Sequence, residues 1–163
     1  MNINNYFDNA ATSYPKPVEV GREISDYLND LGGPYGRSFY GRALDVSRRV
    51  ESCRDLLAFR LGAADSERIV FSSNATQAIN TVLKGFPLRG REIWISALEH
   101  NAVTRPLKSL EETAGIKIKY LPSDNDGLVN LKQLANTDLS GAGLVVVCHQ
   151  SNVNGLIQPA AEI

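Results

Sequence analysis

The chain has 163 residues, of which 43% are hydrophobic, so it is long enough for one domain with a sizeable core. Its 17 basic and 18 acidic residues give a net charge of -1, which provides no electrostatic basis for binding nucleic acid or an anionic membrane. No apolar run approaches the roughly 20 residues that span a bilayer, and no secretion signal is recognisable. We therefore expect a soluble cytoplasmic protein with no nucleic-acid or membrane partner.

The two cysteines, Cys53 and Cys148, are too few for a disulfide framework or a zinc site. Cys53 is in register with the apolar helix positions Val46 and Leu57, and Cys148 ends the apolar run that begins at Leu144. Both thiols are interpreted as core residues in a reducing compartment. No metal site is expected.

The N-terminal half predicts an arm followed by two helices. A polar arm over residues 1–15 is expected to precede a single domain at 16–163. The first helix follows Pro17, has an apolar residue every three or four positions, and ends at Gly32. Its apolar positions are Val20, Ile24, Leu28 and Leu31. A flexible stretch then leads into a long helix over about 43–61, which Gly62 is expected to end.

Beyond Gly62, strands and helices alternate. Strands are expected at residues 68–71, 92–97, 117–121 and 143–148, with helices between them. The helices are marked by apolar stripes: Ala75, Ala78, Ile79, Val82 and Leu83; Val103, Leu107, Leu110 and Ala114; and Leu131 and Leu134. This alternation predicts a three-layer αβα fold of the α/β class with a mainly parallel sheet. The last strand, apolar on both faces, is expected to be central, whereas the alternating segment 116–120 favours a strand with one wet face.

Polar segments follow three of the predicted strands, and ligands of open parallel sheets bind at such strand ends. At the first, a helix start near Ala75 offers free N–H groups and the positive end of the helix dipole. The N–H groups of Ala75 and Thr76 and the Thr76 hydroxyl can therefore bind a phosphate. The alternative is that Ser73 or Asn74 only caps the helix.

His100 and Asn152 stand in the other two segments. His100 is expected in a short turn, because Pro106 fits only the first turn of a helix. Its imidazole can stack on a planar ring, and the alternative is an ordinary surface histidine. Asn152 can donate from its amide to a phenolate oxygen, and the alternative is an Asx turn into Gly155. We expect Thr76, His100 and Asn152 to line one common hollow.

Four segments in this order resemble the class V aminotransferases, which are fold-type I enzymes dependent on pyridoxal 5'-phosphate (PLP), and most closely their cysteine desulfurase-like branch. The segments are Asp8-Asn-Ala-Ala-Thr12, residues 73–80, Glu99-His-Asn-Ala-Val103 and residues 151–159. The resemblance covers nearly the whole chain. It implies the N-terminal part of an incomplete large domain, with the rest of that domain and a small C-terminal domain absent.

The resemblance also implies the cofactor and the residues that hold it. Asn74, Ala75 and Thr76 would bind the phosphate of PLP, His100 would stack on the pyridine ring as a catalytic residue that helps to move protons, and Asn152 would contact the phenolic oxygen. PLP acts as an electron sink that stabilises a carbanion. The implied reaction transfers sulfur from L-cysteine, leaves alanine and an enzyme persulfide, and involves a sulfur-acceptor protein and a homodimer.

The chain also departs from the family pattern. Asn74 stands where Gly is frequent, and Tyr35, Phe39 and Tyr40 occupy a Gly-rich segment that commonly carries a His. The Schiff-base lysine, the acidic partner of the pyridinium and the mobile cysteine would lie beyond Ile163. We therefore expect residues 1–163 alone to be inactive, to bind PLP weakly at most, and to self-associate through an unpaired sheet edge. Two alternatives stay open: an aminotransferase or selenocysteine lyase acting on another amino acid, and a non-catalytic interaction module.

Overall fold

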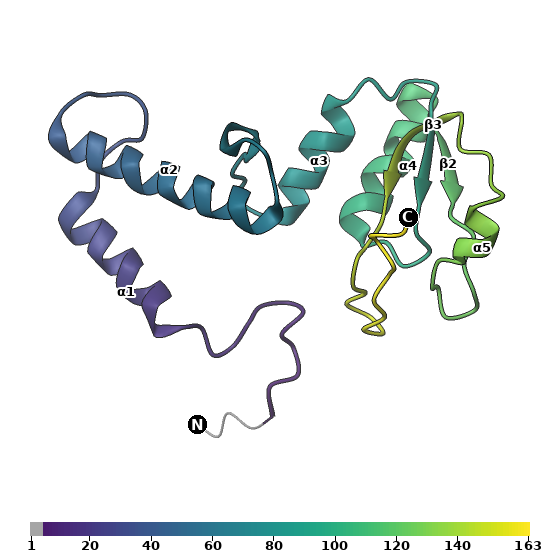
Figure 1. The fold of residues 1–163 in the computed structure, drawn as a ribbon, viewed down its shortest axis with the longest axis horizontal. Helices are drawn as coiled ribbons and strands as arrows, with labels where there is room; N and C mark the ends of the chain where they lie inside the picture. The colour runs from purple at the N-terminus through teal and green to yellow at the C-terminus, as the bar shows by residue number, and fades with distance from the viewer. Residues whose placement is uncertain (1–4) are drawn as a thin grey trace. The chain divides into compact units, whose positions relative to one another are not determined.

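The computed structural model describes residues 5–163. Contacts divide the chain into two compact units, one up to Val70 and one over Phe71–Ile163, and Figure 1 traces both. The sequence-based division into an arm at 1–15 and a domain at 16–163 remains a prediction. In the part of the chain that the structure describes, none of the helices has both the length and the apolar character that a bilayer crossing requires.

The first unit contains the two helices that the sequence predicts. Helix α1 (Val18–Asp26) continues as the π-helical turn η2 (Tyr27–Leu31), and α2 covers Gly41–Leu61. Both end on a glycine with positive φ, 48° at Gly32 and 67° at Gly62. Glycine adopts this left-handed conformation at a lower free-energy cost than other residues, which explains why the helices end where the sequence indicates.

The prediction that Cys53 lies in a core is wrong, because its side chain is exposed. Only Ala43, Val46 and Ala58 of α2 are buried. The elements of this unit that contact α2 are η2 and η3 (Ser66–Arg68), one of which precedes the helix and the other of which follows it. A position in the middle of the helix therefore stays open although its spacing fits the apolar face.

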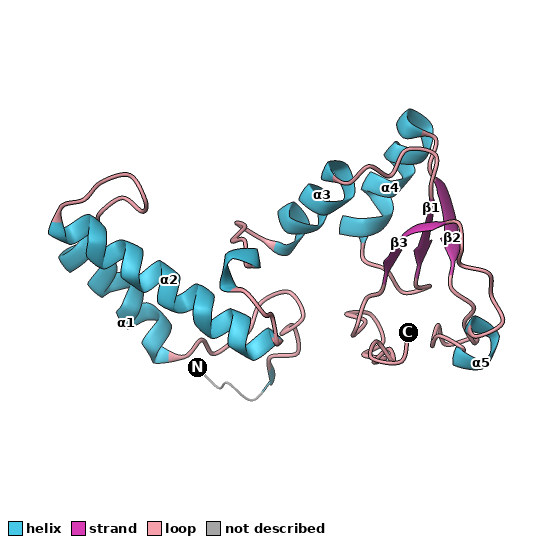
Figure 2. Ribbon diagram, turned by 45° about the horizontal axis from the view of Figure 1, so that its top comes forward, coloured by secondary structure: helices cyan, strands magenta, loops and turns pink. Residues whose placement is uncertain are grey.

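The second unit is a parallel sheet with helices, as predicted. Its elements are α3 (Ala75–Gly85), β1 (Glu92–Ile95), α4 (Asn101–Ala114), β2 (Lys117–Tyr120), α5 (Leu131–Leu134) and β3 (Ala142–Val146). The strand order is β2-β1-β3, and β1 pairs in parallel with both neighbours. Figure 2 shows the three strands side by side.

Helices cover both faces of this sheet. Alternate residues of a strand point to opposite faces, and in β1 both Ile93 and Ile95 pack into a cluster that contains Leu107 of α4 and residues of α3. Trp94 instead packs against the second cluster, which contains Leu134 of α5. The predicted three-layer arrangement is therefore confirmed, with α3 and α4 on one face and the short α5 on the other.

Two strand predictions are wrong. Residues 68–71 form no strand: η3 ends at Arg68, residues 69–71 belong to none of the three strands of the described chain, and Val70 is 82% exposed. An extended segment becomes a strand only when another strand satisfies its backbone groups. The apolar run in β3 predicts a central strand, but β3 lies at the edge, and Val145 is 39% exposed.

Candidate functional site

Asn74 caps helix α3. Its Oδ1 accepts a hydrogen bond from the N–H of Gln77 at 2.8 Å. The Gln77 side chain in turn accepts from the N–H of Ser73 at 3.2 Å and from the Ser73 hydroxyl. The capping interpretation of this segment is therefore confirmed for Asn74. Its carboxamide oxygen is engaged in the cap, and its Nδ2 donates to the Ser73 hydroxyl at 3.3 Å.

The cap leaves an anion seat at the same helix end. The first intrahelical hydrogen bond runs from the N–H of Ala78 to the carbonyl of Asn74 at 3.1 Å. The N–H groups of Ala75 and Thr76, and the Thr76 hydroxyl, have no acceptor among the residues that the structure describes. The helix dipole makes this end electropositive. Capping and anion binding are thus compatible here, since they use different N–H groups.

His100 caps helix α4. Its Nδ1 accepts from the N–H of Ala102 at 3.0 Å, so the proton of the neutral ring lies on Nε2. His100 lies in a short segment between β1 and α4, as expected, but the placing of Pro106 in the first helical turn is wrong, because α4 begins at Asn101 and Pro106 lies in its second turn. The imidazole is therefore oriented by a helix end.

The loop after β3 leaves Asn152 free. The Ser151 hydroxyl accepts from the N–H of Val153 at 3.2 Å, and Asn154 Oδ1 accepts from the N–H of Leu156 at 3.1 Å. The alternative interpretation of Asn152 as an Asx turn is wrong, since the side chains of Ser151 and Asn154 make the turn contacts of this loop. In the part of the chain described by the structure, the Asn152 side-chain amide has no hydrogen-bond partner, and it is exposed.

Two cavities share His100 and Asn101. The larger, of ≈ 470 Å³, lies between α3 and α4 and is lined by Thr76 and His100, among others. The smaller, of ≈ 320 Å³, lies between the loops that follow β1 and β3, where it is lined by Glu99, His100 and Asn152. The single hollow expected from the sequence is therefore divided in two. His100 links Thr76 on one side to Asn152 on the other.

Two cations line the larger cavity, and sequence reasoning missed them. Lys84 of α3 and Arg105 of α4 contribute to its wall, and neither forms a salt bridge within the described residues. The available signal was the spacing of Thr76, Asn80 and Lys84, which places all three on one side of a helix. Together with the end of α3, these charges favour an anionic ligand.

Cys148 lies two residues after the end of β3, in the segment that leads to Asn152. Burial, and secondly the negative charge of Glu99, raise the pKa of its thiol, and its Sγ donates to the carbonyl of Gln150 at 3.3 Å. The thiol is therefore neutral at physiological pH and is a poor nucleophile. No group of three or more His, Cys, Asp or Glu side chains within residues 5–163 could hold a metal ion.

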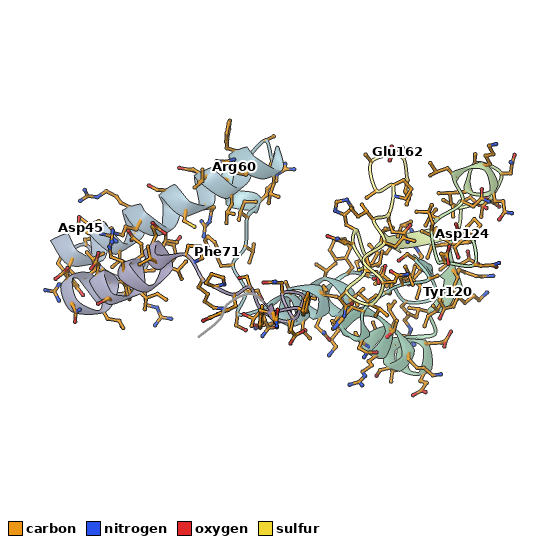
Figure 3. All side chains as sticks on the ribbon, turned by 90° about the horizontal axis from the view of Figure 1, so that it is seen from below. Asp45, Arg60, Phe71, Tyr120, Asp124 and Glu162 are labelled. Atoms are coloured by element: carbon orange, nitrogen blue, oxygen red, sulfur yellow. The ribbon has the colours of Figure 1, made fainter. Side chains whose placement is uncertain are left out.

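A buried glutamine ties the turn at residues 124–128 to the segment that follows the Asn152 loop. Gln158, only 2% exposed, accepts from the N–H of Val129 at 2.9 Å and donates to the carbonyl of Gly127 at 2.7 Å. Gly127 has φ +90°, and a Cβ there would lie 2.7 Å from the Leu98 side chain. Asp124, labelled in Figure 3, closes the same turn by accepting from the N–H of Leu128 at 2.9 Å. This connection is therefore built by residues 29 and 31 positions apart in sequence.

The family model described as Aminotransferase class-V matches residues 5–163. The chain belongs to this family, so the class that the sequence motifs indicate is confirmed. Members of the family are generally PLP-dependent enzymes.

Particular relatives are cysteine desulfurases. The chain is 31% identical over 163 residues to a probable cysteine desulfurase of Halobacterium salinarum, covering 97% of this chain and 39% of the relative. It is 33% identical over 170 residues to the cysteine desulfurase IscS of Pasteurella multocida, covering 100% of this chain and 41% of the relative. The chain thus spans about two fifths of the length of these relatives.

Solved structures agree with this assignment. The apo cysteine desulfurase from Thermococcus onnurineus NA1 is similar with a TM-score of 0.85 and 30% identity, over 96% of this chain and 39% of that chain. SspA, solved in complex with cysteine, is similar with a TM-score of 0.84 and 26% identity, over 97% of this chain and 46% of that chain.

Proposed function

We propose that the protein is a PLP-dependent cysteine desulfurase and that Phe71–Ile163 hold the phosphate and the ring of the cofactor. The observation that carries the proposal is the capped start of α3, where two N–H groups and the Thr76 hydroxyl are left without acceptors beside a cavity that also contains His100. A helix end of this kind binds phosphate through its backbone and its dipole.

Each residue of the phosphate seat has a defined contribution. Ala75 and Thr76 donate their N–H groups, and the Thr76 hydroxyl adds a third donor. Lys84 and Arg105 line the cavity and raise its positive potential. Asn74 acts on the cofactor through the cap, because its side chain orients the turn from which the donors project.

His100 and Asn152 account for the ring. The imidazole stacks on the pyridine plane, and its Nε2 carries the proton that it can exchange with substrate, since Nδ1 is held by the cap. The free Asn152 amide donates to the phenolic oxygen across the smaller cavity. When bound, PLP supplies the electron sink that stabilises a substrate carbanion.

The names of the relatives support L-cysteine as the substrate, with alanine as the released product and sulfur passed to an acceptor protein. A homodimer in the cytoplasm is part of the same proposal. An aminotransferase or a selenocysteine lyase would use the same binding site for PLP, so the identity of the substrate has to be tested separately from cofactor binding.

The test uses protein that contains residues 1–163 in their native context, supplied with PLP. With L-cysteine and an added dithiol, which reduces the enzyme persulfide and is itself oxidised to a disulfide, we expect equal amounts of alanine and sulfide. Thr76→Val should weaken PLP binding about tenfold, because it removes a hydrogen bond to a charged group. Thr81→Val is the matched control, since the Thr81 hydroxyl donates to the carbonyl of Gln77 along α3. Keto-acid formation without sulfide would contradict the desulfurase assignment, and absence of PLP binding would contradict the whole proposal.

A further inference from the structure

One carboxylate oxygen joins the ends of strands β1 and β3. Glu99 Oε1 accepts from the hydroxyl of Ser96 at 2.5 Å and from the backbone N–H of Cys148, which also has a longer contact of 3.4 Å to the Ser96 Oγ. Ser96 is completely buried, and its backbone N–H donates to the carbonyl of Val146 at 3.0 Å. The sheet ladder between β1 and β3 is therefore continued by a side chain at the point where the two strands end.

This connection lies between the two loops of the candidate site. His100 is the next residue after Glu99, and the segment that ends at Asn152 begins directly after Cys148. Hydrogen bonds to a carboxylate are shorter and stronger than those between neutral groups. The distance between the His100 imidazole and the Asn152 side-chain amide is therefore set by a contact between Glu99 and Cys148, which are 49 positions apart in sequence.

We infer that Glu99 is a positioning residue, which fixes the His100 loop relative to the Asn152 loop and so sets the width of the cavity between them. This inference rests on the proposed function for its consequence on cofactor binding. Glu99 itself lines that cavity, and its Oε2 has no hydrogen bond within the described part of the chain. The single bonded oxygen means that a glutamine can reproduce both contacts while it removes the charge.

The test compares three variants. Glu99→Ala removes both hydrogen bonds, Glu99→Gln keeps an acceptor oxygen, and Glu112→Ala is the charge-matched control, since Glu112 is exposed on α4 with no side-chain partner among the described residues. Thermal unfolding first shows that each variant is folded. Amide NMR signals of Cys148 and side-chain signals of His100 and Asn152 are then recorded without ligand, followed by titration with PLP.

In Glu99→Ala we expect the Cys148 amide to lose part of its protection from hydrogen exchange, because only its longer contact to the Ser96 Oγ remains. The His100 and Asn152 signals should shift and broaden together. PLP affinity should fall roughly tenfold, at the low end of the effect of groups that orient a ligand-binding residue. Glu99→Gln should restore most of the affinity, and Glu112→Ala should resemble the wild type.

The inference is overturned if the Cys148 amide is deprotected in Glu99→Ala while the His100 and Asn152 signals and the PLP affinity stay at wild-type values. If Glu99→Ala does not fold, Glu99→Gln is the deciding variant. The inference is also overturned if Glu99→Gln is folded and its His100 and Asn152 signals shift and broaden although the acceptor oxygen is kept. If the wild-type protein binds no PLP, the proposed function is contradicted. The NMR signals recorded without ligand then still test whether Glu99 positions the two loops.

Discussion

His100 combines a structural and a chemical role in one side chain. Its Nδ1 caps α4, while the ring lines both cavities. The two roles use different parts of the imidazole, so they can be separated by substitution. A residue at position 100 has to supply both a capping acceptor and a ring, which restricts the residues that can replace histidine there.

Replacing His100 with asparagine or alanine separates these roles. Asparagine is a strong N-cap residue, so His100→Asn should keep the free energy of unfolding near the wild-type value, whereas His100→Ala should lose about 1 kcal/mol. Both variants lack the aromatic ring and should bind PLP roughly fivefold more weakly, from about 1 kcal/mol of stacking. Urea unfolding and PLP titration check this. Wild-type PLP affinity in His100→Asn would contradict the stacking role.

Glu99→Gln should also change the chemistry of Cys148. Burial remains, but the nearby negative charge that raises the thiol pKa is gone, so the pKa should fall towards its ordinary value. A lower pKa means more thiolate and faster alkylation at about pH 8. The rate is measured in a Cys53→Ser background, because Cys53 is exposed. An unchanged pH profile would show that the Glu99 charge does not reach the thiol.

At the scale of elements, helices are easier to predict than strands in this chain. The ends of α1–η2 and α2 follow from Gly32 and Gly62, which are local signals. A strand depends on partners that can be distant, which is why residues 68–71 and the edge position of β3 were predicted wrongly. An apolar strand sequence indicates that both faces of the strand are covered, but it does not indicate how many other strands pair with it.

The same distinction applies to the site. Thr76, His100 and Asn152 became candidates because each stands in a polar segment that follows a predicted strand. Arg105 was missed because its place in the cavity depends on how α4 lies against α3, and Glu99 because its partner is 49 residues away. Local sequence thus identifies the donors of a site, while the residues that orient or surround them require the tertiary structure.

Helix α4 provides a test of the charge in the larger cavity. Arg105→Gln should weaken PLP binding roughly threefold, as expected for a solvent-accessible charge, and should reduce its dependence on salt concentration. Lys108→Gln on the same helix is the control, since Lys108 is exposed and does not line the cavity. Titrations at low and high salt measure both effects. Equal losses in the two variants would mean that only the overall charge matters.

At the scale of the molecule, the described residues leave apolar surface open. A groove of ≈ 320 Å³ between α3 and the edge strand β3 is lined by apolar side chains, among them Val82 and Val145. The chain covers about two fifths of the length of its curated relatives, 39% and 41% in the two cited above. Exposed apolar grooves beside an unpaired strand favour association.

For a protein that consists of residues 1–163, we therefore predict self-association that light scattering detects as a mass above 17.8 kDa rising with concentration. Val145→Lys places a charge at the β3 edge and should shift the protein towards the monomer. Val153→Lys is the control, since it adds the same charge on a loop residue that is already 86% exposed. A wild-type monomer at all concentrations would contradict the prediction.

The central claim is that the start of α3 and the His100–Asn152 cavity form one binding site for PLP. The most direct measurement is a titration with PLP followed by NMR at the Ala75 and Thr76 amides and at the side chains of His100 and Asn152. We expect all four signals to move with a single dissociation constant, and inorganic phosphate to move the signals of the two amides alone. Signals that respond with different constants, or amides that do not respond at all, would contradict it.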